Sequence, residues 1–253
     1  MNNNCFSMET NMVFLQVSLN GDRRHPAAPR TPEEIGNDAA ATINAGAHSV
    51  HVHAYNSAGK ETLNSFECGA VIRAIRARCP GVPISLTTSE TIISDPLRRL
   101  QTVQSWTEFP DLVTANQGEK GIIALCEWLM SRGVGIEAGL LSPADARTFI
   151  DSPIRDRCHR ILIEPCNPDP VAALRDAEEM GEIVSSAGLT LPQVHHGYDG
   201  SCWAVNQRAL SLGHGIRTGI EDVTVLPDGR AAKSNAELVE AARSLIENNV
   251  RHT

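Results

Sequence analysis

Short apolar runs alternate with longer segments along most of this chain. The first run, at residues 13–19, has the length and apolar content of a buried strand. The longer segments begin with residues that are typical of helix starts. The pattern predicts strands at 13–19, 49–54, 83–87, 111–114, 134–137, 160–164, 192–195 and 215–220. It predicts helices at about 31–46, 66–78, 121–131, 169–186, 202–212 and 234–248, and two more that begin at 94 and 142.

Two of the helix starts carry specific capping signals. Thr31 can cap the first helix, Pro32 suits its first position, and Glu34 can complete a capping box. Ser234 and Glu237 have the same spacing at the start of the last helix. These signals predict where both helices begin.

Eight strands alternating with eight helices imply parallel strands joined by right-handed crossovers. At 253 residues, this alternation predicts an α/β fold of the closed (β/α)8 type, a TIM barrel. The main rival is an open doubly wound sheet, but residues 19–22 lack the glycine fingerprint of its first turn. We expect a single domain over residues 1–253, with residues 1–11 as a polar N-terminal leader.

Composition narrows the class of protein. The hydrophobic fraction of 42% and charged fraction of 21% are ordinary for a soluble globular chain. A net charge of −8 argues against nucleic acid or an anionic membrane as the main partner. No run reaches the roughly 18 apolar residues of a membrane span, and the first residues do not resemble a signal peptide. Seven scattered cysteines predict a reduced, cytoplasmic protein.

The strongest chemical signal is a His-x-His pair in the second strand. The side chains of His51 and His53 share one face because the period of a strand is two. The second and eighth strands both flank the first, so Glu221 can meet them, with Gly219 leaving room for a ligand or a close neighbour. Two imidazoles and a carboxylate predict a catalytic metal site, with zinc as the default and Fe(II) also possible. The alternative is a set of hydrogen-bonded polar residues that bind no metal.

Other polar residues follow the predicted strands. Arg217 and Asp222 could form a structural ion pair, or the Arg217 guanidinium could bind a substrate carboxylate beside a metal. Glu137 could orient a substrate or a water. His195 or His196 could supply a further ligand or a general base, although a hydrogen-bonded loop histidine is the favoured interpretation.

Several of these motifs resemble the β-keto acid cleavage enzymes, a family that includes the 3-keto-5-aminohexanoate cleavage enzymes. The resemblance extends from about residue 13 to residue 246, and the chain is identified as a divergent member. It is carried by residues 20–21, 29–35, 45–53, 86–88, 116–118, 215–222 and 234–239.

The resemblance implies a zinc-dependent (β/α)8 barrel that forms a homo-oligomer, either a dimer or a tetramer. Such enzymes convert a small β-keto acid and acetyl-CoA, the co-substrate, into acetoacetate and a new acyl-CoA. By this resemblance, the metal ligands are His51, His53 and Glu221, and the catalytic pair is Arg217 and Asp222. The substrate-pocket residues are Thr87, Thr114, Asn116 and Glu137.

The sequence also departs from the family pattern. Tyr55 stands where the family usually has an Arg, and Glu90 stands where it has a small residue. A lost cation and an added acid predict a more cationic or less acidic substrate. Two other functions stay open: a metal-dependent hydrolase of the amidohydrolase kind, and a non-catalytic metal-binding barrel.

Overall fold

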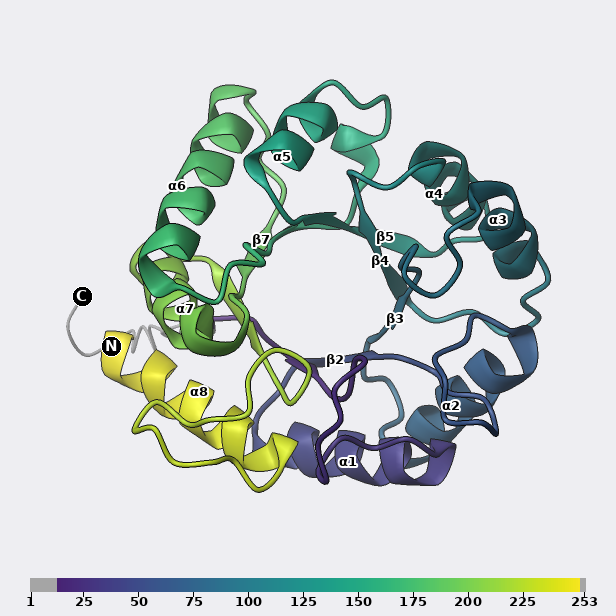
Figure 1. Cartoon of the computed structure of the whole chain (residues 1–253), viewed down its shortest axis with the longest axis horizontal. Coiled ribbons are helices and arrows are strands. Elements are labelled where there is room, and N and C mark those ends of the chain that lie inside the picture. The colour runs from purple at the N-terminus through teal and green to yellow at the C-terminus, as the bar shows by residue number, and fades with distance from the viewer. Residues whose placement is uncertain (1–12, 251–253) are drawn as a thin grey trace, which may run out of the picture.

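The structure, a computed structural model, describes residues 13–250, which form a closed barrel of eight parallel strands ringed by helices (Figure 1). Each strand pairs with the next in the chain, and β1 also pairs with β8, which closes the barrel. The predicted fold class is therefore confirmed. The strands are β1 (Leu15–Ser18), β2 (Ser49–Val52), β3 (Ile84–Thr87), β4 (Leu112–Asn116), β5 (Gly135–Leu140), β6 (Arg160–Ile163), β7 (Gln193–His195) and β8 (Gly215–Thr218).

A helix follows each strand and covers the outside of the barrel. The helices are α1 (Pro32–Ala45), α2 (Ser65–Arg78), α3 (Pro96–Gln104), α4 (Ile122–Ser131), α5 (Pro143–Ile150), α6 (Pro170–Ser186), α7 (Cys202–Ser211) and α8 (Asn235–Val250). Short 3-10 turns, η1 (Arg155–Arg157) and η2 (Asp199–Ser201), precede β6 and α7. In Figure 1 the last helix, α8, lies beside α1, so the first and last helices are neighbours in the ring.

The helix starts agree with the sequence signals. Thr31 accepts a hydrogen bond from the backbone N–H of Glu34, and Glu34 bonds back to complete the predicted capping box. Ser234 likewise accepts from the backbone N–H of Glu237 at 3.2 Å. Each such contact satisfies an N–H that the first turn of a helix leaves free.

Apolar side chains fill the layer between strands and helices, whereas polar ones lie within the barrel. Leu15 and Val17 of β1 belong to the large apolar core, together with Ile35 of α1. The alternate β1 residues are equally buried but polar: Gln16 bonds to a side chain on β5, and Ser18 to one beyond β8. This alternation gives the barrel a polar lining at the ends of its strands.

The eighth strand ends earlier than predicted. It stops at Thr218 rather than at residue 220, and Gly219 has a φ of +152°. A Cβ atom at Gly219 would lie 1.9 Å from the backbone oxygen of Ser18, so only glycine lets the chain cross β1 this closely. Glu221 therefore reaches the barrel mouth on the turn after β8 and not on the strand itself. The close neighbour expected at Gly219 is the β1 backbone.

The described residues form one barrel, and none of its helices is both long and apolar enough to cross a membrane. The expected leader at residues 1–11 lies outside the described part of the chain. The single-domain organisation over residues 1–253 therefore stays a prediction.

Candidate functional site

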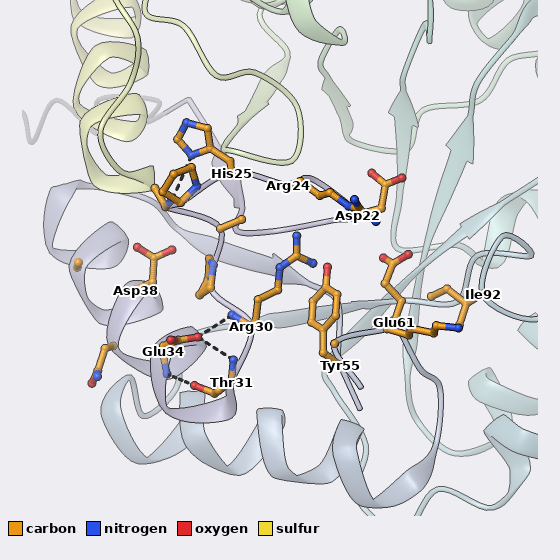
Figure 2. Close-up of a pocket in the computed structure, with 18 of the residues that line it drawn as sticks. Asp22, Arg24, His25, Arg30, Thr31, Glu34, Asp38, Tyr55, Glu61 and Ile92 are labelled. Carbon is orange, nitrogen blue, oxygen red and sulfur yellow. Dashed lines mark hydrogen bonds between the residues drawn. The ribbon is translucent and has the colours of Figure 1, made fainter. Parts of the chain in front are cut away.

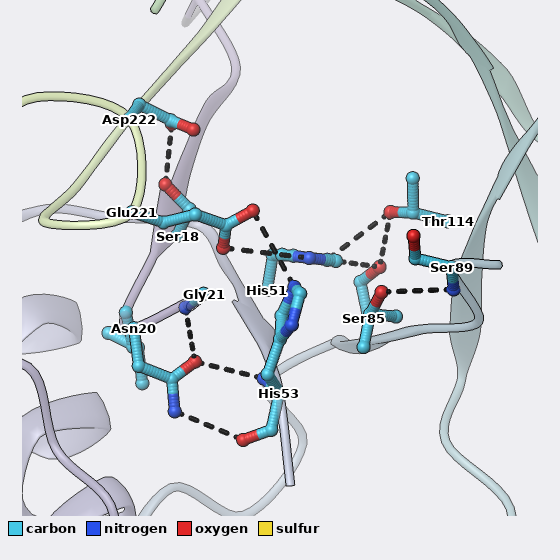
Figure 3. A network of polar contacts seen from close by, with 12 residues as sticks. Ser18, Asn20, Gly21, His51, His53, Ser85, Ser89, Thr114, Glu221 and Asp222 are labelled. Atoms are coloured by element: carbon cyan, nitrogen blue, oxygen red, sulfur yellow. Dashed lines mark hydrogen bonds and ion pairs between the residues drawn. The ribbon is translucent and has the colours of Figure 1, made fainter. Parts of the chain in front are cut away.

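His51, His53 and Glu221 converge at the carboxyl ends of the strands (Figure 3). The Nε2 atom of His51 lies 3.7 Å from Oε2 of Glu221, and Nε2 of His53 lies 3.6 Å from Oε1. The two imidazole rings stand nearly perpendicular, at 79°, with centroids 5.3 Å apart. One potential ligand atom from each residue thus faces a common point, with all three atoms within 4.8 Å of one another.

These residues fit a divalent metal ion. Four-coordinate zinc with bonds near 2.0–2.2 Å separates its ligand atoms by about 3.3–3.6 Å, close to the two imidazole–carboxylate distances found here. Oε2 of Glu221 is buried and has no hydrogen-bond partner among the described residues. An unpaired buried carboxylate oxygen is costly unless a cation occupies the space before it. The three residues are therefore suited to hold a divalent ion and to leave its remaining coordination positions open for substrate.

The surroundings of the three residues set their charges. Burial lowers the pKa of His51 to about 3, and Glu221 opposes this only partly. Burial by itself would lower the pKa of His53, but the nearby carboxylates of Glu221 and Glu61 outweigh burial and raise the pKa to about 9. Burial would raise the pKa of Glu221, yet Arg217 and the imidazoles hold it well below its usual range. An ionised Glu221 and a neutral His51 are the forms that bind metal, whereas His53 would have to release a proton to an incoming ion.

Arg217 and Asp222 form a two-point ion pair beside this centre. Nε of Arg217 donates to Oδ2 of Asp222 at 3.0 Å, and Nη2 donates to Oδ1 at 2.8 Å. The same Nη2 donates to Oε1 of Glu221 at 3.0 Å. Burial would lower the pKa of Arg217, but Asp222 and Glu221 raise it well above its usual range. The guanidinium is thus a fixed cation in contact with the ligand set.

His196 extends this pair into a larger polar cluster. Its Nδ1 lies 3.5 Å from Oδ1 of Asp222, and its Nε2 lies 3.1 Å from Oε2 of Glu164. Burial would raise the pKa of Glu164, but His196 and Arg217 lower it to about 2. His195 faces elsewhere, with Nε2 2.9 Å from Gln193 and its ring stacked on His214.

Sequence reasoning gave Glu164 no role and favoured a simple loop histidine at His196. Both residues directly follow a strand, at Ile163 and at His195, and this was the signal that could have found them. Ser18 was also missed, although its hydroxyl donates to Asp222.

The floor of the site is organised around Glu137, which is fully buried. Its carboxylate accepts hydrogen bonds from Gln16 at 2.9 Å, from Thr114 at 3.2 Å and from Ser85, and it pairs with Arg160 at 3.3 Å.

The hydroxyls of Ser85 and Thr114 also lie 3.2 Å from Nδ1 of His51. Because both hydroxyls donate to Glu137, their oxygens accept from His51, which assigns the proton to Nδ1. The lone pair of Nε2 then points toward Glu221.

Thr87 and Asn116 lie at the ends of β3 and β4, apart from this network. The hydroxyl of Thr87 accepts from the backbone N–H of Ser89 at 3.3 Å, and the amide of Asn116 donates to Glu119 at 2.9 Å. Within residues 13–250 no hydrogen bond joins either side chain to the three proposed ligands. Of the four predicted substrate-pocket residues, the structure links Thr114 and Glu137 to His51.

A groove of about 1380 Å³ opens beside the ligand set, between the loops that follow β1 and β2 (Figure 2). Tyr55 and Glu61 lie on one side of it, and Arg24 and Arg30 contribute cationic groups. Arg30 stacks over the Tyr55 ring, with its guanidinium carbon 4.2 Å from the ring centroid. Glu61 also contacts Nδ1 of His53, so the groove adjoins the centre through this residue.

Several known proteins are similar to this chain in sequence or in fold. A model of the beta-keto acid cleavage enzyme family matches residues 12–155 and 171–253. A 3-keto-5-aminohexanoate cleavage enzyme of Fusobacterium nucleatum is 29% identical over 236 residues, 85% of this chain and 83% of that protein. The enzyme of the same name from Acetoanaerobium sticklandii is 27% identical over 235 residues, with the same two shares covered.

Solved structures show a similar barrel. The ternary complex of ObcA with a C4-CoA adduct and oxalate has a TM-score of 0.72 and 17% identity, over 89% of this chain. This chain spans 65% of the length of that ObcA chain. At such identity the similarity concerns the fold.

Proposed function

Because the chain belongs to the beta-keto acid cleavage enzyme family as a divergent member, we propose that it is a zinc-dependent C–C bond cleaving acyltransferase. A β-keto acid and acetyl-CoA would give acetoacetate and a new acyl-CoA. C2 of the β-keto acid would lose a proton and bond to the acetyl carbonyl carbon, while the acetyl–sulfur bond of acetyl-CoA breaks and frees the CoA thiolate. The thiolate would then bond to C3 as the C2–C3 bond breaks, and C2 would regain a proton. The released acyl group is transferred to the CoA sulfur, so this retro-Claisen exchange consumes neither oxidant nor water.

The observation that carries the proposal is the convergence of His51, His53 and Glu221 beside the Arg217–Asp222 pair. A bound divalent ion would supply Lewis acidity to the keto group of the substrate. Nitrogen and oxygen ligands with open positions support zinc, and Fe(II) uses the same ligand types. Metal analysis of the purified protein distinguishes the two.

Arg217 and Asp222 are the proposed catalytic pair. Arg217 is a permanent cation whose Nη2 already contacts a ligand oxygen, so it lies where enolate charge would develop. Asp222 fixes the guanidinium through two hydrogen bonds, and Ser18 and His196 hold Asp222 in turn. Asp222 would take up and return the substrate proton, because Arg217 stays charged, and Arg217 would stabilise the developing negative charge.

Thr87, Thr114, Asn116 and Glu137 stay proposed as substrate-pocket residues. Glu137 is fully buried, so it would act through the hydroxyls of Ser85 and Thr114. Two acids support a substrate side chain that is cationic or neutral: Glu90 after β3, and the ionised Glu164 after β6. Homo-oligomerisation and a cytoplasmic location also stay predictions.

The proposal is tested with purified protein, acetyl-CoA and β-keto acids whose side chains are cationic, neutral or anionic. Mass spectrometry should show acetoacetate and the matching acyl-CoA in equal amounts, with anionic side chains disfavoured. His51→Ala should lose the metal and at least about 100-fold in rate, because Lewis-acid stabilisation supplies several kcal/mol. His159→Ala removes an exposed histidine outside the site and should retain both metal and rate.

Each other result points to a different function. Turnover that needs water but not CoA supports the hydrolase, and metal binding without turnover supports the non-catalytic barrel. A preference for anionic side chains contradicts only the proposed substrate class. Metal retained at full stoichiometry by His51→Ala contradicts the ligand set.

A further inference from the structure

We infer that Glu61 is a positioning residue for the metal centre, holding Nδ1 of His53 so that Nε2 faces the ion. The inference rests on the proposed metal site and adds a residue from outside the three ligands. The carboxylate of Glu61 contacts Nδ1, the ring nitrogen that does not face Glu221. A carboxylate in this place fixes the proton on Nδ1 and makes the opposite nitrogen a better ligand.

The backbone sets the position of Glu61. After β2 the chain forms a hairpin in which Tyr55 and Glu61 make an antiparallel bridge. The N–H of Thr62 donates to the oxygen of Ala54 at 2.9 Å, and the N–H of Asn56 donates to the oxygen of Lys60 at 2.9 Å. Glu61 is therefore held across from the continuation of the His53 strand by main-chain hydrogen bonds.

His53 is fixed at its backbone as well. Its N–H donates to Oδ1 of Asn20 at 2.9 Å, and its carbonyl oxygen accepts from Nδ2 of the same residue at 3.0 Å (Figure 3). With both backbone groups bound to one side chain, rotation of the imidazole is the remaining freedom. The contact with Glu61 removes that freedom.

The two imidazole ligands are supported differently. Nδ1 of His51 faces two neutral hydroxyls inside the barrel, whereas Nδ1 of His53 faces a charged carboxylate at its rim. The His53 side chain is 11% exposed and that of Glu61 is 17% exposed, against 2% for His51. Because the barrel packs less tightly around His53, that ligand depends more on a single partner.

Glu61 also lines the groove beside the centre, where Figure 2 shows it next to Tyr55. Without the carboxylate, the groove would admit water to Nδ1 of His53. Loss of Glu61 should therefore weaken metal binding without removing any ligand.

The test uses metal-free wild type, Glu61→Gln, Glu61→Ala and Lys60→Ala, each titrated with Zn²⁺ against a chelator of known affinity. We expect Glu61→Ala to bind about 10–100-fold more weakly, the usual effect of losing such a partner. Glu61→Gln keeps an acceptor oxygen and should be intermediate. Lys60→Ala changes an exposed neighbour in the same hairpin and should match wild type. The absorption bands of bound Co²⁺ should shift in both Glu61 variants.

Other outcomes overturn the inference in distinct ways. Equal Zn²⁺ affinity and an unchanged Co²⁺ spectrum in both Glu61 variants would show that Glu61 does not position His53. Complete loss of Zn²⁺ binding in both Glu61 variants would make Glu61 a direct ligand instead. Wild type that takes up no Zn²⁺ would contradict the metal site itself. If Glu61→Ala does not fold, as judged by circular dichroism, the isosteric Glu61→Gln decides alone.

Discussion

A single carboxylate, Glu221, connects the two parts of the site. One oxygen accepts from Arg217 at 3.0 Å, while the other has no hydrogen-bond partner within residues 13–250. The residue can therefore bind an ion and hold the guanidinium at the same time. Binding or loss of a metal ion should change the interaction of Glu221 with Arg217, because the ion and the guanidinium compete for the same negative charge.

Asp38 of α1 offers a separate test at the scale of one residue. Burial raises its pKa from 3.8 to about 6, and a hydrogen bond from Asn235 only partly opposes this. The folded protein keeps a proton that the unfolded chain has already lost. Stability should therefore decline as pH rises from about 4 to 6, and should remain lower above that range.

Asp38→Asn should abolish this decline. The variant should have a higher Tm than wild type at pH 7 and no advantage at pH 4, as measured by calorimetry across that range. The buried amide keeps an oxygen that can accept from Asn235. A variant whose pH profile parallels that of wild type would show that Asp38 is not the group responsible.

Some site residues could be predicted from sequence and others could not. Short motifs in which all the residues are close together in the sequence include four of the candidate residues: His51, His53, Arg217 and Asp222. Glu61 meets His53 only when the hairpin after β2 forms, and Glu164, His196 and Asp222 meet only when separate segments of the chain fold together. No pattern of spacing along the sequence encodes those contacts.

At the scale of elements, strands and helices were predictable because their signals are local. Proline and capping residues mark helix starts, and short apolar runs mark the strands. The end of β8 was not predictable, since it depends on the approach of Gly219 to the backbone of Ser18. The bridge between Tyr55 and Glu61 likewise depends on a hairpin that the apolar pattern does not mark.

The turn after β8 gives a prediction at this scale. Gly219→Ala should lower the free energy of unfolding by more than about 3 kcal/mol, because the new Cβ collides with the backbone oxygen of Ser18. It should also weaken Zn²⁺ binding by displacing Glu221. The matched control is Gly213→Ala, with a φ of +75° and open space around it, which should cost only about 1–2 kcal/mol.

Urea denaturation of both variants measures the two free energies of unfolding. Similar losses in the two proteins would mean that backbone conformation alone, and not the contact with β1, makes glycine necessary at position 219.

At the scale of the whole molecule, Asn235 connects the last β–α unit of the barrel to the first. Its amide accepts from the backbone N–H of Ile220 at 2.7 Å and donates to the backbone oxygen of Leu19 at 2.7 Å. It also donates to Asp38 on α1 at 2.6 Å. One fully buried side chain thus ties α8 to the turn that bears Glu221 and to the first β–α unit.

Asn235→Ala should destabilise the protein by about 2–3 kcal/mol, because it leaves buried backbone groups without partners. Asn64→Ala is the control, since Asn64 stands before α2 and its side chain makes no capping hydrogen bond. Thermal unfolding should separate the two variants clearly. Equal melting temperatures would indicate that water replaces the lost amide.

Of the three proposed ligands, His51 lies in β2, His53 follows it directly, and Glu221 lies in the turn after β8, so most of the chain separates the imidazoles from the carboxylate. During synthesis the imidazoles leave the ribosome long before the glutamate does. A nascent chain that still lacks Glu221 can offer an ion only two of the three proposed ligands, and their geometry is absent before folding. Loading of the proposed site would thus follow folding, and the metals that the cell makes available after translation would decide which ion enters.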